Sequence, residues 1–479
     1  MKSPSLNYQW IESILLKNSI LINSTPSKTK NTNEFYTEVS TDTRSLKKGA
    51  LFAAIKGDQF DGHAFLQKAT ELGSSAVLSE LSFKDSKITN EVDYFQVKDV
   101  TNALRFLAQA WREQFEIPII AITGSVGKTS TKELVSACFK GKHANVLSTR
   151  ASENGYLGIA LTLLRLEKSH QAAIIEIGID EPGAMEKHLE VVDPTSAILT
   201  TIGPEHLEKL INIKTVAKEE LLSLHWVDEK NGAIAINADD PLIESAFNET
   251  KKPNQHFFSL GNINANYSVT GSLDSSKNLL KINNSIEGEK NFEIPLPLPG
   301  EHNARNLLGA VCIALANKVT PAEIKKGLKD FFTQPFGRSE TVTLNNGVTV
   351  YCDFYNSNPT SLNAALEVTK KYSPPKWLCL GDMLELGEEE KKYHTDIALK
   401  LLKDFNTKNN HILLYGKRMR WLFEEMKKSQ YLFSLAHFED IQLLSAELSK
   451  NVQKNDFVLL KGSRGMKMES IYEHLKKNS

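Results

Sequence analysis

A glycine-containing segment at residues 118–132 has the residue types and order of a phosphate-binding loop. It reads PIIAITGSVGKTSTK, so an apolar β-branched run enters a turn between Gly124 and Gly127 and a helical pattern follows. The backbone N–H groups of such a turn and the N-terminus of the following helix form a concave site for phosphate oxygens. Lys128 is expected to neutralise the β- and γ-phosphates of a nucleotide, and the Thr129 hydroxyl to bind Mg²⁺. The residues predicted to line this site are Gly124, Ser125, Val126, Gly127, Lys128, Thr129 and Ser130.

The glycine spacing of this segment departs from the usual phosphate loop. The first glycine normally stands five residues before the second, and that position here is Ile122. Gly124 lies only three residues before Gly127. The segment is therefore a shortened phosphate loop or a chance surface turn, and the order strand, turn, helix favours the loop.

Polar residues follow two further predicted strands. Glu176 lies near the end of the strand-like run 172–177, and His206 comes shortly after the run 197–202. Ligands of open parallel sheets collect at the carboxyl ends of the strands, and a carboxylate there can bind Mg²⁺. A solvated strand-end glutamate and a structural histidine explain the same residues. His206 becomes a stronger candidate for a ligand only if Lys128 and Glu176 lie nearby.

Other candidates in the middle of the chain have two interpretations each. Lys218 lies in a helical stretch, where a solvated lysine is the simpler interpretation. Asn237 belongs to N-A-D-D-P, which is also typical of a turn. His302, Asn303 and Asn306 precede and enter an Ala-rich helix, and a helix cap explains part of this pattern.

Polar groups near two predicted strand ends of the last third of the chain could reach a nucleotide. Arg338 could bind phosphates, although from position alone a surface arginine is the favoured interpretation. Asp353 ends a strand and could bind ribose hydroxyls, as in dinucleotide folds. The segment 355–359 is rich in hydrogen-bonding groups but reads equally as a turn, and 461–465 (KGSRG) is either an anion site or a solvated loop.

Length and pattern predict an α/β protein of three domains. The chain has 479 residues, which corresponds to about three domains of roughly 150 residues. Apolar strands alternate with helical stretches, which predicts mostly parallel sheets covered by helices. The expected domains are residues 1–113, 114–334 and 335–479, with antiparallel hairpins at 262–298 added to the second.

Composition limits the classes of partner and the compartment. The net charge is −1, so no basic field favours a nucleic acid or a membrane. The four cysteines form no C-x-x-C pair, which predicts buried free thiols in a reducing cytoplasm. The run 14–22 lacks the features of a signal peptide, and no apolar run has membrane-spanning length.

Taken in order, these motifs resemble the Mur ligases of bacterial cell-wall synthesis over nearly the whole chain. The C-terminal motifs are similar to those of the members that add D-alanyl-D-alanine to UDP-N-acetylmuramoyl-tripeptide. The shortened loop is similar to the family's own phosphate loop. The motifs are TGSVGKT at 123–129, TDTR at 41–44, GALF at 49–52, DGH at 61–63, GPEHL at 203–207, AKE at 217–219, GDMLELG at 381–387 with His394, YNSNP at 355–359 and KGSRGM at 461–466.

The resemblance implies three α/β domains: an N-terminal domain that binds the UDP substrate, a central phosphate-loop ATPase-like parallel sheet and a Rossmann-like C-terminal domain. It implies ATP as a substrate and two Mg²⁺ ions. The implied catalytic residues are Lys128, Lys218 and Arg338. The implied metal ligands are Thr129, Glu176, His206 and a carbamylated Lys218. The implied nucleotide contacts beyond the loop are Asn237, His302, Asn303, Asn306, Arg338 and Asp353. The implied substrate contacts are Thr43, Arg44, Asp61, Asn154, Tyr355, Asn356 and Asn358.

Two segments depart from the family's pattern. Residues 151–155 (ASENG) keep only Asn154 of the usual paired asparagines, and residues 178–183 lack the usual Ala-Asn-His. Both segments face substrate or metal in the family, so details of peptide recognition are expected to differ.

The expected activity is ATP-dependent ligation of D-alanyl-D-alanine to UDP-N-acetylmuramoyl-tripeptide through an acyl phosphate. A cytoplasmic monomer without nucleic-acid or membrane partners is expected. One alternative is a Mur ligase that adds a single amino acid such as meso-diaminopimelate. Another is a phosphate-loop regulatory module, which would hydrolyse ATP without any muramyl peptide.

Overall fold

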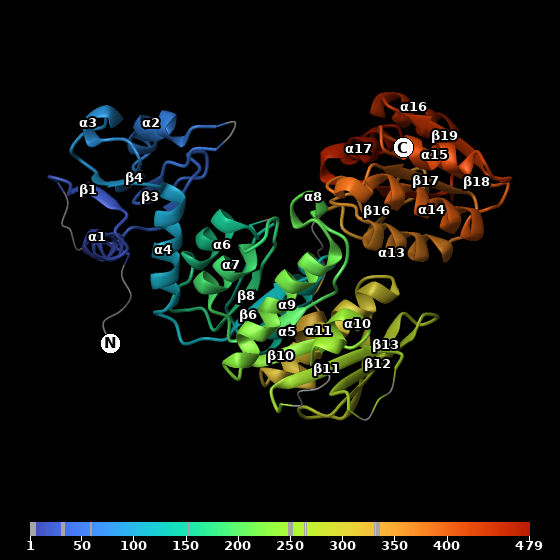
Figure 1. Ribbon diagram of the computed structural model, residues 1–479, viewed down its shortest axis with the longest axis horizontal. Helices are drawn as coiled ribbons and strands as arrows, with labels where there is room; N and C mark the ends of the chain where they lie inside the picture. Colours follow the sequence, from blue (N-terminus) through green and yellow to red (C-terminus); the bar gives the residue numbers. More distant parts are fainter. Residues whose placement is uncertain are drawn as a thin grey trace. The chain divides into compact units, whose positions relative to one another are not determined.

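The computed structural model describes residues 6–29, 34–57, 60–151, 153–247, 252–262, 264, 266–329, 331 and 336–479 (Figure 1). It divides into two compact units. The first comprises Met1–Ala121, His143–Gly178 and Met185–Ser196, and the second comprises Ile122–Lys142, Ile179–Ala184 and Ala197–Ser479. The expected boundary at residues 334 and 335 lies outside the described residues.

Three sheets build the chain, and their strands alternate with helices as expected for an α/β protein. The sheets have five, nine and six strands. All strands of the first lie before residue 98, those of the second between residues 119 and 295, and those of the third after residue 339. The predicted α/β class is therefore confirmed.

The first sheet has the order β1-β5-β4-β3-β2, with β1 antiparallel to β5 and the other pairs parallel. Its strands are β1 (Leu21–Thr25), β2 (Val39–Ser40), β3 (Leu51–Ala53), β4 (Ala76–Ser79) and β5 (Asp93–Val97). The helices of this part are α1 (Tyr8–Lys17), α2 (Leu66–Glu71), α3 (Phe83–Ser86) and α4 (Val100–Arg112). The strongly amphipathic α4 is capped by Asp99, whose carboxylate accepts a hydrogen bond from the Asn102 N–H at 2.6 Å.

The second sheet has the order β14-β13-β12-β11-β10-β9-β6-β8-β7. Its strands are β6 (Ile119–Thr123), β7 (Val146–Ser148), β8 (Ala172–Glu176), β9 (Ser196–Leu199), β10 (Ala233–Asn237), β11 (Gln255–Leu260), β12 (Val269–Asp274), β13 (Leu279–Asn284) and β14 (Asn291–Pro295). Its helices are α5 (Lys128–Lys142), α6 (Tyr156–Leu163), α7 (Ala184–Val192), α8 (Leu207–Leu210), α9 (Ile213–Glu229), α10 (Pro241–Phe247), α11 (Glu301–Ala316) and α12 (Pro321–Lys329). Strands β12, β13 and β14 pair antiparallel, which confirms the expected hairpins; residues 263 and 265 of that range lie outside the described residues.

Helix α5, which follows the glycine-containing loop, packs closely against α12. A Cβ added to Gly141 would lie 1.9 Å from the carbonyl oxygen of Glu323. A Cβ added to Gly327 would lie 2.0 Å from the carbonyl oxygen of Ala137. Only glycine at both crossing positions allows the two backbones to approach this closely. The start of α5 is therefore supported by a tightly packed helix pair.

The third sheet has the order β15-β16-β20-β17-β18-β19, with only β15 antiparallel among these strands. Its strands are β15 (Glu340–Thr343), β16 (Thr349–Cys352), β17 (Lys376–Gly381), β18 (Asn410–Tyr415), β19 (Ser434–Phe438) and β20 (Phe457–Lys461). Its helices are α13 (Pro359–Lys370), α14 (Glu390–Asp404), α15 (Met419–Met426), α16 (Ile441–Asn451) and α17 (Glu469–Lys477).

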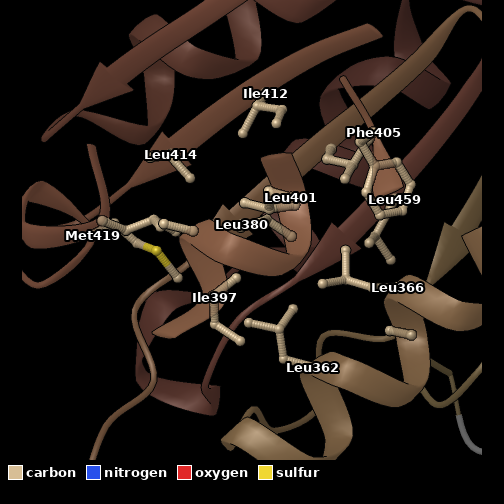
Figure 2. Packing of buried hydrophobic residues seen from close by; sticks show 14 of the residues in the cluster. Leu362, Leu366, Leu380, Ile397, Leu401, Phe405, Ile412, Leu414, Met419 and Leu459 are labelled. Carbon is tan, nitrogen blue, oxygen red and sulfur yellow. The ribbon is translucent and has the colours of Figure 1, made fainter. Parts of the chain in front are cut away.

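Alternate residues of the third sheet's strands face two different cores. In β17, Leu378 and Leu380 join the core formed with α13, α14 and α15, and Trp377 and Cys379 join the core formed with α16 and α17. This period of two follows from the strand geometry. Figure 2 shows the first core, in which Leu380 lies among side chains of α13, α14 and neighbouring strands. Helices thus cover both faces of the sheet, so its strands read as continuous apolar runs.

The remaining expectations about burial also hold for the described residues. All four cysteines are buried and free, which confirms the predicted buried thiols. None of the helices in the described part of the chain is long and apolar enough to cross a bilayer.

Candidate active site

The loop between β6 and α5 has the backbone conformation that its two glycines were expected to provide. Gly124 has φ +119° and Gly127 has φ +89°, conformations that other residues rarely adopt. A Cβ on Gly124 would lie 2.2 Å from Thr200 Oγ1. Helix α5 begins at Lys128 directly behind the loop, and the N-terminus of a helix favours an anion.

The segment after β9 fixes this loop by hydrogen bonds. The Ser125 N–H donates to the Thr201 carbonyl at 2.8 Å, and the Gly203 N–H donates to Ser125 Oγ at 2.9 Å. The Thr200 hydroxyl donates to the Val126 carbonyl at 2.6 Å. These contacts hold the shortened glycine spacing in a defined geometry, unlike a chance surface turn.

Two buried glutamates lie against the loop. The Gly124 N–H donates to Glu220 Oε2 at 2.7 Å, and Lys128 Nζ lies 3.2 Å from Glu205 Oε2 and also donates to the Gly124 carbonyl. Both side chains are buried, Glu220 completely. Burial, and then the charge of Glu205, raise the pKa of Glu220 well above its usual range, although Lys128 opposes this shift.

Sequence reasoning missed Glu220 and selected its neighbour Lys218. Lys218 is exposed on α9. Two residues that are two positions apart in an α-helix are separated by about 200° around its axis. Lys218 and Glu220 therefore point to opposite sides of α9. The sequence did hold a signal, because Glu220 shares the buried stripe of Val216, Leu224 and Val227 at helical spacing. A carboxylate at a core-facing position is itself an indication of function.

Two predicted nucleotide contacts lie at the loop. A Cβ on Gly127 would lie 2.9 Å from both Nδ2 and Oδ1 of Asn306, so the Asn306 amide lies directly against the loop backbone. The Asn237 Nδ2 donates to the Thr200 carbonyl at 2.6 Å. Asn237 is buried at the end of β10 and its Oδ1 accepts from the Asp239 N–H at 3.0 Å, so its described contacts shape the loop's support.

His302 and Asn303 begin α11 and have different surroundings. The Asn303 Nδ2 donates to the Pro299 carbonyl at 2.7 Å, which satisfies a backbone group before the helix. Burial lowers the pKa of His302 to about 4, partly opposed by the charge of Asp353. His302 is therefore neutral at neutral pH and offers a hydrogen bond rather than a positive charge.

A second cluster in the same unit follows β16. The guanidinium carbon of Arg338 lies 3.5 Å from the ring centroid of Tyr355, which is cation–π geometry. The carboxylate of Asp353 accepts from the Ser339 N–H at 3.1 Å and pairs with the buried Lys461 at 2.9 Å. Arg338, Tyr355 and Asp353, chosen from separate motifs, thus lie in one neighbourhood.

The asparagines after Tyr355 have contacts that the turn interpretation also predicted. The Asn358 side chain accepts from the Ser361 N–H at 2.9 Å and forms a capping box at the start of α13. The Asn356 Oδ1 accepts from the Ser357 N–H at 2.9 Å, and its carbonyl accepts from Lys461 Nζ at 2.8 Å. The motif residue His394 is buried and accepts a hydrogen bond from the Met383 N–H at 3.1 Å.

In the first unit, Asn154 and Glu176 lie in direct contact. The Asn154 Nδ2 donates to Glu176 Oε1 at 2.9 Å, and Glu176 is buried at the end of β8. A Cβ on Gly178 would lie 3.3 Å from the Asn154 amide, so glycine leaves room for this contact. The single asparagine kept from the family's pair therefore positions the predicted metal-binding carboxylate.

The residues predicted to bind substrate in the N-terminal part are largely accessible. Arg44 is exposed and forms a bidentate pair with Asp42, which lowers the pKa of that carboxyl group. Thr43 between them is partly buried. The Asp61 carboxylate accepts from the His63 N–H at 3.0 Å and lies 2.6 Å from His63 Nδ1.

The predicted metal ligand His206 directly precedes α8, as its N-cap residue, in a left-handed conformation with φ +47°. Its Nδ1 lies 2.6 Å from Glu385 Oε2, and this contact raises the pKa of His206. Among the residues that the structure describes, no three His, Cys, Asp or Glu side chains gather as a complete metal cluster. Nucleotide oxygens or water are therefore needed to complete any metal site there.

The loop at the end of a parallel strand, the lysine at the start of α5 and the nearby carboxylates define a phosphate-loop nucleotide-binding α/β protein. Family comparison agrees and is more specific. The Mur ligase middle domain matches residues 122–314, the Mur ligase glutamate ligase domain matches 337–464, and the Mur ligase family catalytic domain matches 35–113. The chain belongs to the Mur ligase family.

Individual relatives cover nearly the whole chain. A UDP-N-acetylmuramoyl-tripeptide–D-alanyl-D-alanine ligase of Bacillus subtilis is 30% identical over 91% of this chain and 92% of its own length. The crystal structure of MurF from Acinetobacter baumannii superposes with a TM-score of 0.81 at 25% identity and covers 100% of both chains. MurF from Thermotoga maritima in complex with ADP has the same fold, with a TM-score of 0.76 at 22% identity over 92% of this chain and 97% of that one.

Proposed function

We propose that this chain is an ATP-dependent ligase that joins D-alanyl-D-alanine to UDP-N-acetylmuramoyl-tripeptide in peptidoglycan precursor synthesis. The observation that carries the proposal is the fixed phosphate loop with Lys128 at the start of α5. It stands in a chain whose full-length relatives are named as this ligase.

The reaction needs positioning and charge neutralisation rather than a protein nucleophile. A terminal carboxylate oxygen of the tripeptide attacks the γ-phosphorus, and the bond to the β-phosphate oxygen breaks to release ADP. The amine of the dipeptide then attacks the acyl-phosphate carbonyl. Phosphate leaves with the original carboxylate oxygen, and the amine loses a proton as the amide forms.

The described side chains suit these steps. Lys128 and Arg338 neutralise charge on the transferring phosphate, and Asp353 accepts from the ribose hydroxyls. The Asn306 amide at the loop and the neutral His302 contact the nucleotide, with Asn237 near the adenine and Asn303 at the start of α11. The residues proposed to bind the UDP-tripeptide and the dipeptide are Thr43, Arg44, Asp61, Asn154, Tyr355, Asn356 and Asn358.

Mg²⁺ fits the chemistry of the proposed donors. Thr129 is buried at the start of α5 and carries a hydroxyl, and Glu176, which Asn154 orients, carries a carboxylate; both are oxygen ligands of the kind that Mg²⁺ takes. A bound Mg²⁺ would neutralise charge on the phosphate oxygens. Thr129 is proposed for one ion, and Glu176 with His206 for a second. Carbamylation of Lys218 stays a prediction, and its exposed position does not support a role at the loop.

The assay of this function measures phosphate release from ATP in the presence of UDP-muramyl tripeptide, with and without D-alanyl-D-alanine. The proposal predicts release that depends on both acceptor and dipeptide. Release equal to the no-dipeptide control would refute it. Replacing the dipeptide by meso-diaminopimelate tests the single-amino-acid alternative, and hydrolysis without any muramyl peptide would indicate a regulatory module.

The proposed partners are therefore these two substrates, and the protein is proposed to act as a cytoplasmic monomer. The four buried free thiols are consistent with a reducing compartment. Size-exclusion chromatography with light scattering tests the monomer, and a mass of two chains would contradict it.

A further inference from the structure

The two glutamates at the phosphate loop leave part of their hydrogen-bonding capacity unused. One oxygen of each has a partner: Glu220 Oε2 accepts from the Gly124 N–H, and Glu205 Oε2 pairs with Lys128. The other oxygen of each, Oε1, is buried and receives no hydrogen bond from a donor among the described residues. The two carboxyl groups lie within hydrogen-bonding reach of each other. Relative to their fully exposed state, Glu220 is 0% and Glu205 only 7% accessible.

Such a pair needs either a proton shared between the two carboxyl groups or a counter-charge. Moving a carboxylate out of water is costly unless it is paired or binds a metal ion. Lys128 supplies one positive charge to the two carboxyl groups. A Lys128 that turns toward nucleotide phosphates gives up this pairing, and the carboxyl groups then need another cation.

We propose that Glu205 and Glu220 bind a divalent metal ion at the phosphate loop together with nucleotide phosphate oxygens. This inference rests on the proposed function, because the nucleotide completes the ligand set. Two carboxylates plus phosphates and water are the ligands that Mg²⁺ commonly takes, so the lack of a three-residue cluster among the described residues is consistent with it. Oxygen ligands alone select Mg²⁺ or Mn²⁺ rather than Zn²⁺.

Glu220 offers at the loop the kind of ligand that a modified Lys218 was predicted to supply. A lysine carbamate offers a carboxylate, and Glu220 already is one. It lies on the buried side of α9 against Gly124, whereas Lys218 lies on the exposed side. Metal binding by this chain therefore needs neither Lys218 nor carbon dioxide.

A purely structural role explains only half of the observations. The bond from Gly124 to Glu220 Oε2 positions the loop, and the neighbouring Glu219 makes a comparable bond to the Gly183 N–H at 2.8 Å. Positioning of the loop does not account for the buried Oε1 atoms of Glu205 and Glu220. A proton shared between the two carboxyl groups, or a cation in its place, accounts for both oxygens, and Mn²⁺ binding distinguishes the two.

The test is Mn²⁺ binding to the full chain in the presence of ADP, followed by electron paramagnetic resonance of free and protein-bound Mn²⁺. Glu220→Gln and Glu205→Gln keep side-chain shape and remove a charge, so each is expected to weaken protein-bound Mn²⁺ roughly tenfold or more. Lys214→Ala, at another exposed position of α9, is the matched control and is expected to stay within about twofold of the wild type. Lys218→Ala tests the rival assignment, in which the modified lysine supplies the ligand, and the proposal predicts an unchanged Mn²⁺ affinity for it.

Circular dichroism, and ADP binding in EDTA, establish that each variant is folded. The wild type is also measured in carbonate-free buffer, an arm that requires no variant, and its Mn²⁺ affinity is expected to be unchanged. Unchanged Mn²⁺ affinity in a folded Glu220→Gln or Glu205→Gln protein would overturn the proposal. A loss of affinity in Lys218→Ala, or in the carbonate-free wild type, would do the same. The Mn²⁺ measurement contains no muramyl peptide or dipeptide. Its outcome therefore does not depend on whether the ligase assay succeeds or fails.

Discussion

The substitution Gly124→Ala should disrupt the phosphate loop in two ways, and the structure allows the free-energy cost of each to be estimated. The φ of +119° lies in a region that costs a residue with a side chain about 1–3 kcal/mol. The new Cβ would lie 2.2 Å from Thr200 Oγ1 and 3.0 Å from the Thr200 nitrogen. The Thr200 hydroxyl donates to the Val126 carbonyl, and displacing it leaves a buried polar group unpaired at about 1–3 kcal/mol.

Together these terms amount to about 2–6 kcal/mol. The lower value corresponds to roughly a thirtyfold loss of ADP affinity if the loop must return to its native shape to bind. It also corresponds to a fall in melting temperature of about 4–8 °C for a domain of this size. Isothermal titration calorimetry with ADP and a fluorescence melt measure the two quantities.

Gly155→Ala is the matched control, because Gly155 has φ −103° and nothing lies within 4 Å of its Cβ position. This variant should bind ADP as the wild type does. Because Gly155 is the N-cap of α6, its stability should fall by no more than the cost of alanine at an N-cap, about 1 kcal/mol. The reasoning fails if Gly124→Ala binds ADP within about threefold of the wild type, since that difference is only about 0.7 kcal/mol.

Further predictions concern packing, burial and pH. Tyr36→Phe removes the hydrogen bond to the buried Asp93 at 2.8 Å, so urea unfolding should show about 1.5–3 kcal/mol lower stability; an unchanged midpoint would contradict it. Gly327→Ala places a Cβ 2.0 Å from the Ala137 carbonyl and should lower the melting temperature, since backbone atoms on both sides leave no rotamer to relieve the overlap. The four buried cysteines, with thiol pKa values raised by burial, should react with a thiol reagent only after unfolding; labelling of the native protein would refute this. The pKa of His302 is lowered to about 4, so the unfolded chain binds more protons than the folded protein between pH 4 and about 6.5. The free energy of unfolding should therefore fall on acidification through that window. His302→Gln should flatten this part of the pH profile, and an identical slope would argue against a buried, neutral His302.

Sequence patterns were sufficient for the fold and for the loop. Continuous apolar runs predicted strands such as β8 and β20, because both faces of these sheets are covered by helices. Gly124 and Gly127 were read correctly, since only glycine takes the conformations that they adopt. Residue types alone therefore indicate local backbone conformations of this kind.

The part of the site beyond the loop was harder to predict from the sequence, because it depends on which side of a helix or strand faces the phosphate loop. Lys218 was predicted from its motif. The residue that contacts the loop is the buried Glu220, two positions further along α9. Glu205 was passed over beside the more familiar His206. The partnership of Arg338 with Tyr355, and of Asp353 with Lys461, arises from tertiary packing that no spacing along the chain reveals.

The central claim is that the tripeptide carboxylate is activated as an acyl phosphate, and an isotope measurement tests it most directly. The tripeptide is prepared with ¹⁸O in its terminal carboxylate and incubated with ATP, Mg²⁺ and D-alanyl-D-alanine, and the released phosphate is analysed by mass spectrometry. The account predicts one ¹⁸O atom in each released phosphate, because a carboxylate oxygen bonds to phosphorus and leaves with it. Release of phosphate that carries no ¹⁸O, alongside the peptide product, would contradict the account.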